Sequence, residues 1–287
     1  MRGSPRLSPR AGAALLLLAA ALWGSSVVVI KPILPDLPAA WINVARFAIA
    51  AVALSPFIRA DTRIWLTGME LGGWLFAGYA TQTTALLYTT VNRCAFITAM
   101  NVIFVPLIAA LFGRRIRPVI WAAAVTAFIG CGLLCHDGSG PNIGDFWTLL
   151  TAITWAVYIL RLESKAADFP PLPLAIAQIV PVALLSGVWM SVHRQPLVHF
   201  HWPALLFLGL AATATTTCLQ AIGQRVVPAP QAAVIFTLEP VFTAVLAYLI
   251  LHQRLTPTGG LGAALIVLAA LATQLPPSRR VVTAAAP

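Results

Sequence analysis

Residues 18–23 read Leu-Ala-Ala-Ala-Leu-Trp, and residues 150–155 read Leu-Thr-Ala-Ile-Thr-Trp, 132 positions further along the chain. The same offset pairs Lys31 with Glu163, Pro38 with Pro170 and Arg46 with Gln178. Each match alone is weak, but their constant order over two segments indicates an internal repeat.

Further along, the repeat continues at an offset of 138. This offset pairs Gln82 with Gln220, Ala95 with Ala233, Asn101 with Glu239 and Phe104 with Phe242. The chain therefore divides into two related halves, 11–135 and 144–275. The flanking residues 1–10 and 276–287 are rich in Pro, Ser, Arg and Ala, which predicts disordered tails.

The composition places the chain in lipid. Of its 287 residues 60% are hydrophobic and 9% are charged, whereas soluble domains carry about 25% charged residues. The apolar runs are continuous and do not alternate, so they predict membrane-spanning helices and argue against a transmembrane barrel.

Polar residues, prolines and glycines divide these runs into ten predicted spans. They are 11–31, 38–58, 66–88, 93–113, 118–135, 144–162, 171–192, 203–223, 231–251 and 257–275. The first has the basic start of a signal peptide, and Ala19-Ala20-Ala21 resembles a cleavage site. Its apolar run continues to Ile30, however, and the repeat needs this segment, so we interpret it as a span.

The basic residues set the orientation. With the amino terminus in the cytoplasm, thirteen Lys and Arg fall on the inner side and four on the outer side. This asymmetry predicts that both termini are cytoplasmic, in an inner or plasma membrane. It also accounts for the net charge of +10 without nucleic acid, because the basic residues stand at span ends and form no basic face.

An odd number of spans in each half means that the two halves insert in opposite directions. This inverted-repeat plan is typical of secondary transporters, which bind substrate near the bilayer midplane between the halves. A small-molecule substrate and the lipid bilayer are the expected partners, and a homodimer is left open.

Several motifs resemble the EamA branch of the drug/metabolite transporter superfamily over nearly the whole chain between the tails. They are Trp23-Gly24 with Lys31, Arg46, the stretch Ala85–Pro106, and Ala233–Phe242 with Glu239-Pro240. The resemblance implies ten helices in two five-helix repeats around a central cavity, lined mainly by the first, third, fourth, sixth, eighth and ninth spans. It also favours export. The sequence departs from the family where Gly-Glu-Arg often follows the fourth and ninth spans; here Gly113-Arg114-Arg115 and His252-Gln253-Arg254 stand instead.

Arg46 and Glu239 are ionisable residues near the middle of predicted spans. A charge at that depth costs about 2.5–3.5 kcal/mol on insertion scales, so it needs a partner or a wet cavity. We interpret Glu239 as a site for a proton or a cationic substrate group, and Arg46 as a site for an anionic group or a support for the cavity. The alternative is a structural ion pair, or hydrogen bonds to backbone freed by Pro240.

Other candidates for the cavity are polar or aromatic residues inside spans. They are Trp23, Tyr79, Gln82, Asn101, Trp155, Tyr158 and Gln220. The aromatic rings could stack a planar ligand or hold a cation, although helix packing explains them equally well. Pro106, Pro181 and Pro240 fall within spans and should kink or loosen them.

Other chemistry finds little support in the sequence. Cys94, Cys131, Cys135 and Cys218 lie in apolar runs and are interpreted as buried small side chains rather than a metal site. His193, His199 and His201 are interpreted as an exposed loop. We expect no cofactor, no metal and no enzymatic activity.

The sequence therefore predicts a secondary transporter of a small organic metabolite or drug-like compound, with proton coupling through Glu239 as a hypothesis. Three alternatives remain: an uncoupled facilitator, an intramembrane enzyme, and a structural membrane subunit. An enzyme would need several midplane acids or histidines, and a structural subunit has no use for the duplicated polar faces.

Overall fold

The computed structural model describes residues 7–33, 36–85, 87–89, 91–136, 141–193, 199–251 and 256–274, and within these ranges it contains helices and connections but no strand. The first half of the chain forms α1 (Pro9–Ile30), η1 (Lys31–Ile33), α2 (Ala39–Leu54), η2 (Ser55–Phe57), α3 (Thr62–Ala85), α4 (Val91–Thr98), α5 (Asn101–Leu111) and α6 (Pro118–Cys135). The second half forms α7 (Ile143–Ala166), α8 (Pro171–His193), α9 (Trp202–Gly209), a π-helical turn η3 (Leu210–Thr215), α10 (Thr216–Gly223), α11 (Ala229–Phe236), α12 (Glu239–Leu251) and α13 (Pro257–Thr273). The predicted all-helical class is confirmed for the described residues.

Among the described residues, eight helical stretches are long and apolar enough to cross a membrane. They are Pro9–Ile30, Ala40–Phe57, Cys94–Leu111, Pro118–Cys135, Ile143–Ala166, Pro171–Val192, Trp202–Gly223 and Ala229–Ile250. The remaining predicted spans, 66–88 and 257–275, fall on α3 and α13. α3 has 24 residues but is more polar than the others, and α13 is apolar but has 17 residues. The count of ten spans therefore stays a prediction.

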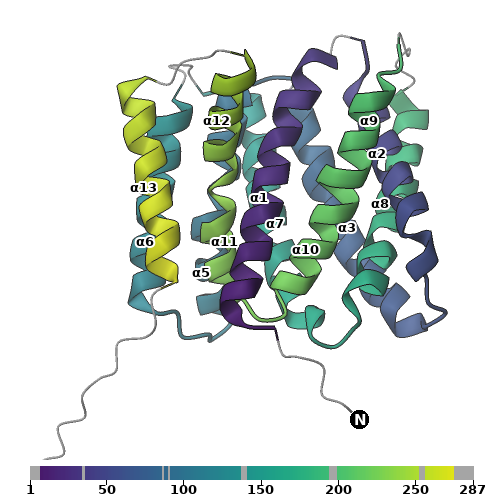
Figure 1. Cartoon of the computed structure of the whole chain (residues 1–287), viewed down its shortest axis with the longest axis horizontal. Helices are drawn as coiled ribbons and strands as arrows, with labels where there is room; N and C mark the ends of the chain where they lie inside the picture. Colours follow the sequence, from purple (N-terminus) through teal and green to yellow (C-terminus); the bar gives the residue numbers. More distant parts are fainter. Residues whose placement is uncertain are drawn as a thin grey trace, which may run out of the picture.

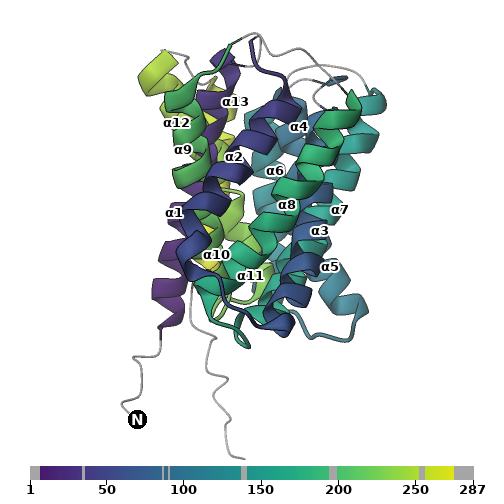
Figure 2. The same ribbon diagram turned by 90° about the vertical axis from the view of Figure 1, so that its right-hand side faces the viewer.

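The helices lie side by side along one common direction (Figures 1 and 2). The start of α1 and the end of α13 lie at the same end of the bundle, at the bottom of Figure 1. The connections from α2 to α3, α5 to α6, α7 to α8 and α10 to α11 lie at that end too. Basic residues gather on or beside these connections: Arg59, Arg63, Arg114, Arg115, Arg117, Lys165 and Arg225. We call this the basic end.

The outside of the bundle is apolar and part of its inside is polar. Val52, Leu111, Phe112, Leu184 and Val192 are each more than 60% exposed, whereas buried positions include charged, amide and hydroxyl side chains. A soluble protein does not expose apolar side chains along the length of its helices in this way. The surface therefore matches a hydrocarbon solvent, in which the backbone polar groups are satisfied within each helix.

The two halves make equivalent contacts. α1 packs against α10, α11 and α12, and α7, its counterpart at the offset of 132, packs against α3, α4 and α5. Likewise α2 packs against α9 and η3, and α8 packs against α3. α2 also contacts α8, and α6 contacts α13, so these counterparts pair with each other. The first helix of each half thus lies against the helices of the other half.

The α6–α13 contact depends on two glycines that let the backbones approach. A Cβ atom at Gly130 would lie 2.7 Å from the carbonyl oxygen of Gly262, and one at Gly262 would lie 2.5 Å from that of Gly130. No flexible side chain can move aside there, because the obstacle is backbone. Gly260, two residues earlier on α13, has no neighbouring atom within 4 Å.

We therefore expect Gly262→Ala to lower the free energy of unfolding by about 1–3 kcal/mol, through overpacking against α6. The matched variant Gly260→Ala should raise it by up to about 1 kcal/mol, because alanine favours helix over glycine. Thermal unfolding in detergent measures both. Equal shifts in the two variants would show that the helices are not in close contact at Gly262.

Candidate functional site

Two helices are interrupted in the middle of the bundle, at equivalent positions of the two halves. α4 ends at Thr98 and α5 begins at Asn101, while α11 ends at Phe236 and α12 begins at Glu239. At the offset of 138 that relates the repeats, both bounds of α4 coincide with those of α11, and the start of α5 coincides with that of α12. The interruptions therefore belong to the duplicated plan and are not local accidents of one half.

Pro240 accounts for one interruption only. It is the second residue of α12, where a missing N–H is tolerated because the first turn of a helix has no internal acceptor for it. The equivalent position in the first half is Val102, which has an N–H that donates to the carbonyl of Ala99. Pro106 lies inside α5 and Pro181 inside α8, and both helices continue through them. Their predicted role in gating stays a prediction.

Glu239 is positioned by a close crossing of α1 and α12. A Cβ atom at Gly24 would lie 2.7 Å from the backbone oxygen of Glu239. The Thr243 hydroxyl lies 3.1 Å from the carbonyl oxygens of both Gly24 and Glu239, and this fixes the two helices to each other. Within the described part of the chain, the Glu239 carboxylate has neither a hydrogen-bond partner nor an ion-pair partner. It is a half-buried acid left available for a ligand or a proton.

Arg46 is held by the π-helical turn η3. Its Nε donates to Thr213 Oγ1 at 2.8 Å, and its Nη2 donates to the Ala212 carbonyl at 3.1 Å. The Arg46 guanidinium carbon lies 5.2 Å from the centre of the Tyr79 ring, a cation–π distance. A π-helical turn in an otherwise α-helical segment is often found at functional sites; here it presents a carbonyl and a hydroxyl to a buried cation that would otherwise be costly.

Glu239 and Arg46 form no ion pair with each other in the described structure. Their charges are nevertheless close enough to interact, and Tyr79 is within range of both. The structure therefore does not contain the direct ion pair that the sequence left as an alternative for these two residues. Each charge has its own surroundings: Arg46 is bound by α9–η3–α10 and an aromatic ring, and Glu239 stands at the start of a half-helix.

Aromatic rings connect Arg46 to the second half. The Tyr79 ring lies edge to face with Trp155 at 5.3 Å between centres, and Trp155 lies in the same way against Tyr158 at 5.7 Å. Trp23, the repeat counterpart of Trp155, lies 5.2 Å from Phe236 at the end of α11. Trp23 thus lies beside the interruption between α11 and α12, and both tryptophans are only partly buried.

Tyr158 and Gln220, two of the residues predicted to line the cavity, make hydrogen bonds to other residues of the protein. The Tyr158 hydroxyl donates to Gln178 Oε1 at 2.9 Å, and both residues are buried. Gln220 Nε2 donates to Gln224 Oε1 at 2.9 Å, and Gln224 Nε2 donates to the Ile159 carbonyl at 3.0 Å. These residues support α7 from α8 and α10. Gln82 and Asn101 are half-buried on α3 and at the start of α5, and their predicted contact with substrate stays a prediction.

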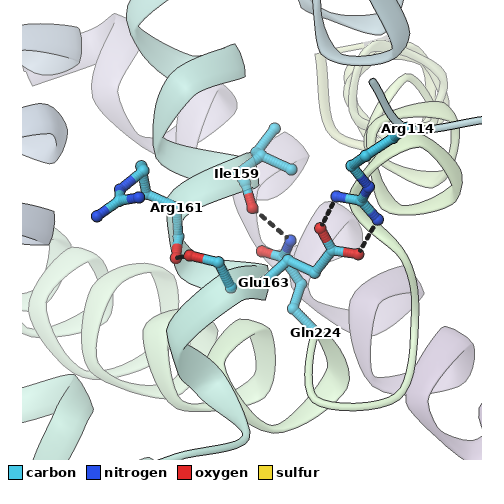
Figure 3. A network of polar contacts seen from close by, with 6 residues as sticks. Arg114, Ile159, Arg161, Glu163 and Gln224 are labelled. Carbon is cyan, nitrogen blue, oxygen red and sulfur yellow. Dashed lines mark hydrogen bonds and ion pairs between the residues drawn. The ribbon is translucent and has the colours of Figure 1, made fainter. Parts of the chain in front are cut away.

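The structure also reveals ion pairs that the sequence analysis missed. Arg114 binds the Glu163 carboxylate through two nitrogens, at 2.5 and 2.8 Å (Figure 3). Arg161 Nε lies 2.5 Å from Glu70 Oε1. The hydrogen bonds that Arg114 donates to Glu163 raise the pKa of the Arg114 guanidinium above its ordinary value, which keeps it charged. Glu70 lies inside the predicted span 66–88, and an acid within an apolar segment was the sequence signal that pointed to an ion-pair partner.

The histidines and cysteines of the described residues form no cluster with metal-ligand geometry. Nowhere in the described ranges do three His, Cys, Asp or Glu side chains gather as a metal site would require. His201 pairs with Asp36 at 2.9 Å, and its ring lies 5.3 Å from that of His199. The side chain of His193 lies outside the described residues. The four cysteines are free and buried, as the sequence predicted.

The comparisons with known proteins agree with this architecture. The model of the EamA-like transporter family matches residues 10–135 and 142–274. The chain is a membrane transporter by fold and family. More particularly, it belongs to the EamA-like transporter family.

Relatives and a solved structure cover most of the chain. An uncharacterized transporter of Archaeoglobus fulgidus is 31% identical over 266 residues, which are 91% of this chain and 84% of that protein. The threonine/homoserine exporter RhtA of Escherichia coli K12 is 24% identical over 278 residues, 91% of this chain and 90% of that one. A crystal structure with a TM-score of 0.80 and 19% identity covers 92% of this chain and 96% of its own, which shows a shared fold.

The Tyr158–Gln178 bond makes a prediction about stability. Because both side chains are buried, Tyr158→Phe leaves the Gln178 carbonyl oxygen without a donor, and we expect the free energy of unfolding to fall by about 1–3 kcal/mol. Adding Gln178→Leu to that variant should restore part of the loss. Tyr88→Phe, at an exposed tyrosine, is the matched control and should have little effect. Additive losses in the double variant would contradict the bond.

Proposed function

We propose that this protein exports a small amphoteric metabolite, of about the size of an amino acid, by alternating access between two inverted five-helix halves. In this proposal ten spans cross the inner or plasma membrane, and the basic end faces the cytoplasm with both termini. The substrate lies at the midplane between the interrupted helices. Glu239 takes a proton or a cationic group, and Arg46 attracts an anionic one.

The observation that carries this proposal is the pair of interrupted helices. In transporters with inverted repeats, half-helices that begin near the midplane direct their positive N-termini at anionic groups of the substrate or coupling ion. Here both half-helices, α5 and α12, begin at repeat-equivalent residues, Asn101 and Glu239. One of these two residues is an acid with no partner among the described residues.

Opposite charges at one site fit a substrate that carries both signs. Arg46 uses two of its nitrogens on Thr213 and Ala212, and its Nη1 makes no bond to a described residue. Glu239 offers a carboxylate, and Tyr79 and Trp155 offer aromatic faces or edges. The relative named as a threonine/homoserine exporter supports an amino-acid-like cargo and outward transport.

We expect Glu239→Gln to reduce export by roughly tenfold or more, equivalent to about 1.4 kcal/mol or more of lost stabilisation. Glutamine keeps the size of the side chain and removes its charge. The measurement is the accumulation of amino acids and related metabolites outside cells that express each variant at equal membrane levels. Asp168→Asn, at an exposed acid on the basic end, is the control and should export normally.

A compound exported by the native protein and by Asp168→Asn but not by Glu239→Gln identifies the substrate class. Equal export by all three proteins would contradict a role for Glu239. Depletion of the compound from the medium, in place of its accumulation, would contradict the outward direction.

Proton coupling has a separate test. If Glu239 carries the coupling proton, export into an acidic medium should be faster than export into a neutral one, because protons enter as substrate leaves. Glu239→Gln should export at a rate that does not change with external pH. Transport measured in proteoliposomes with imposed pH gradients decides this. The same pH dependence in both proteins would exclude coupling through Glu239, and insensitivity to the gradient in the native protein would indicate an uncoupled facilitator.

A further inference from the structure

The Arg114–Glu163 and Arg161–Glu70 pairs both join the two halves of the chain, and both are made by α7. Arg114, on the connection between α5 and α6, and Glu70, on α3, belong to the first half. Glu163 and Arg161, their respective partners, lie on α7 in the second half. All four residues lie toward the basic end of the bundle.

The two pairs hold α7 from opposite sides. Residues two apart on an α-helix point in directions about 200° apart, so Arg161 and Glu163 face different neighbours. Figure 3 shows the Arg161 guanidinium pointing away from α7 on the side opposite to Glu163 and Arg114. α7 is thus bound to α3 on one side and to the α5–α6 connection on the other. Its bond to Gln224, by contrast, remains within the second half.

The repeat counterparts of these residues cannot form the same contacts. Glu163 corresponds to Lys31 at the offset of 132, and Arg114 and Arg115 correspond to His252 and Gln253 at the offset of 138, with Arg254 next to them. Arg161 corresponds to Val29 and Glu70 to Leu208. None of these counterpart positions carries a carboxylate. Among the described residues of the opposite end, the halves are joined by the pair of His201 with Asp36, which is ionic only when the histidine is protonated.

We propose that the Arg114–Glu163 and Glu70–Arg161 pairs are a gate that closes the passage between the halves at the basic end and must open for access from that side. This inference rests on the alternating access and orientation of the proposed function. The gate biases the protein toward the conformation closed to the cytoplasm. A substrate loading from the cytoplasm must wait for both pairs to separate. The bidentate geometry of Arg114 makes that pair the stronger of the two.

Accessibility of a reporter cysteine tests the gate without any substrate. The reporter is Gln82→Cys on α3, in a chain whose four native cysteines are replaced by alanine. A membrane-impermeant maleimide labels it in inside-out and in right-side-out vesicles. The quantity measured is the ratio of the labelling rate from the basic end to the rate from the other end.

Neutralising one pair, by Glu163→Gln or Glu70→Gln, should raise this ratio about two- to fivefold, and neutralising both should raise it about tenfold. Exchanging the charges, Arg114→Glu with Glu163→Arg, should return the ratio to within about twofold of the native value. Arg115→Gln, at the exposed neighbour of Arg114, is the control and should leave it unchanged.

A purely structural role predicts something different: neutralisation would loosen the protein and speed labelling from both ends alike, with no change in the ratio. An unchanged ratio, a reporter that remains unlabelled in every variant, or an equal effect of Arg115→Gln would overturn the gate. Since no transported compound enters the experiment, a wrong substrate class or direction in the proposed function would leave its result intact.

Discussion

The backbone of this protein is constrained by the absence of water around its helices. In hydrocarbon an unpaired backbone N–H or carbonyl costs several kcal/mol, so regular helix is the default, and departures from it must be compensated inside the protein. Three such departures in the described residues lie between Thr98 and Asn101, between Phe236 and Glu239, and over the π-helical turn Leu210–Thr215. All three lie within the bundle, and all three are associated with the candidate site. At η3 the compensation is visible, since Arg46 donates to the Ala212 carbonyl and to the Thr213 hydroxyl.

The same constraint explains why the two buried charges behave differently. Arg46 has two hydrogen bonds and an aromatic face, so its surroundings stabilise it in the resting structure. Glu239 begins a helix, where the unpaired N–H groups favour a negative charge, but its carboxylate lacks a bonded partner among the described residues. A charge that is well supported is suited to remain in place through a cycle. One that is poorly supported is suited to gain and lose a proton or a ligand.

The sequence predicted the class of fold and the helical segments well, because continuous apolar runs and their polar breaks are strong local signals. It located Arg46 and Glu239, since an ionisable residue inside an apolar run is conspicuous. It did not predict the interruption before Asn101, because no proline or glycine stands there, nor the π-helical turn, which depends on the approach of Arg46. It did not predict that Glu163 pairs with Arg114. Ion pairs between distant segments depend on which helices become neighbours, so an acid such as Glu70 inside an apolar span indicates a partner without identifying it.

The two equivalent interruptions differ chemically, because α5 begins with an amide, Asn101, and α12 begins with an acid, Glu239. An amide does not titrate in the physiological range, so this pair of positions can bind one proton and never two. If protons drive this carrier through these residues, its stoichiometry is limited to one per cycle. The largest concentration gradient that it could maintain for a neutral substrate is then set by the free energy released when one proton crosses the membrane.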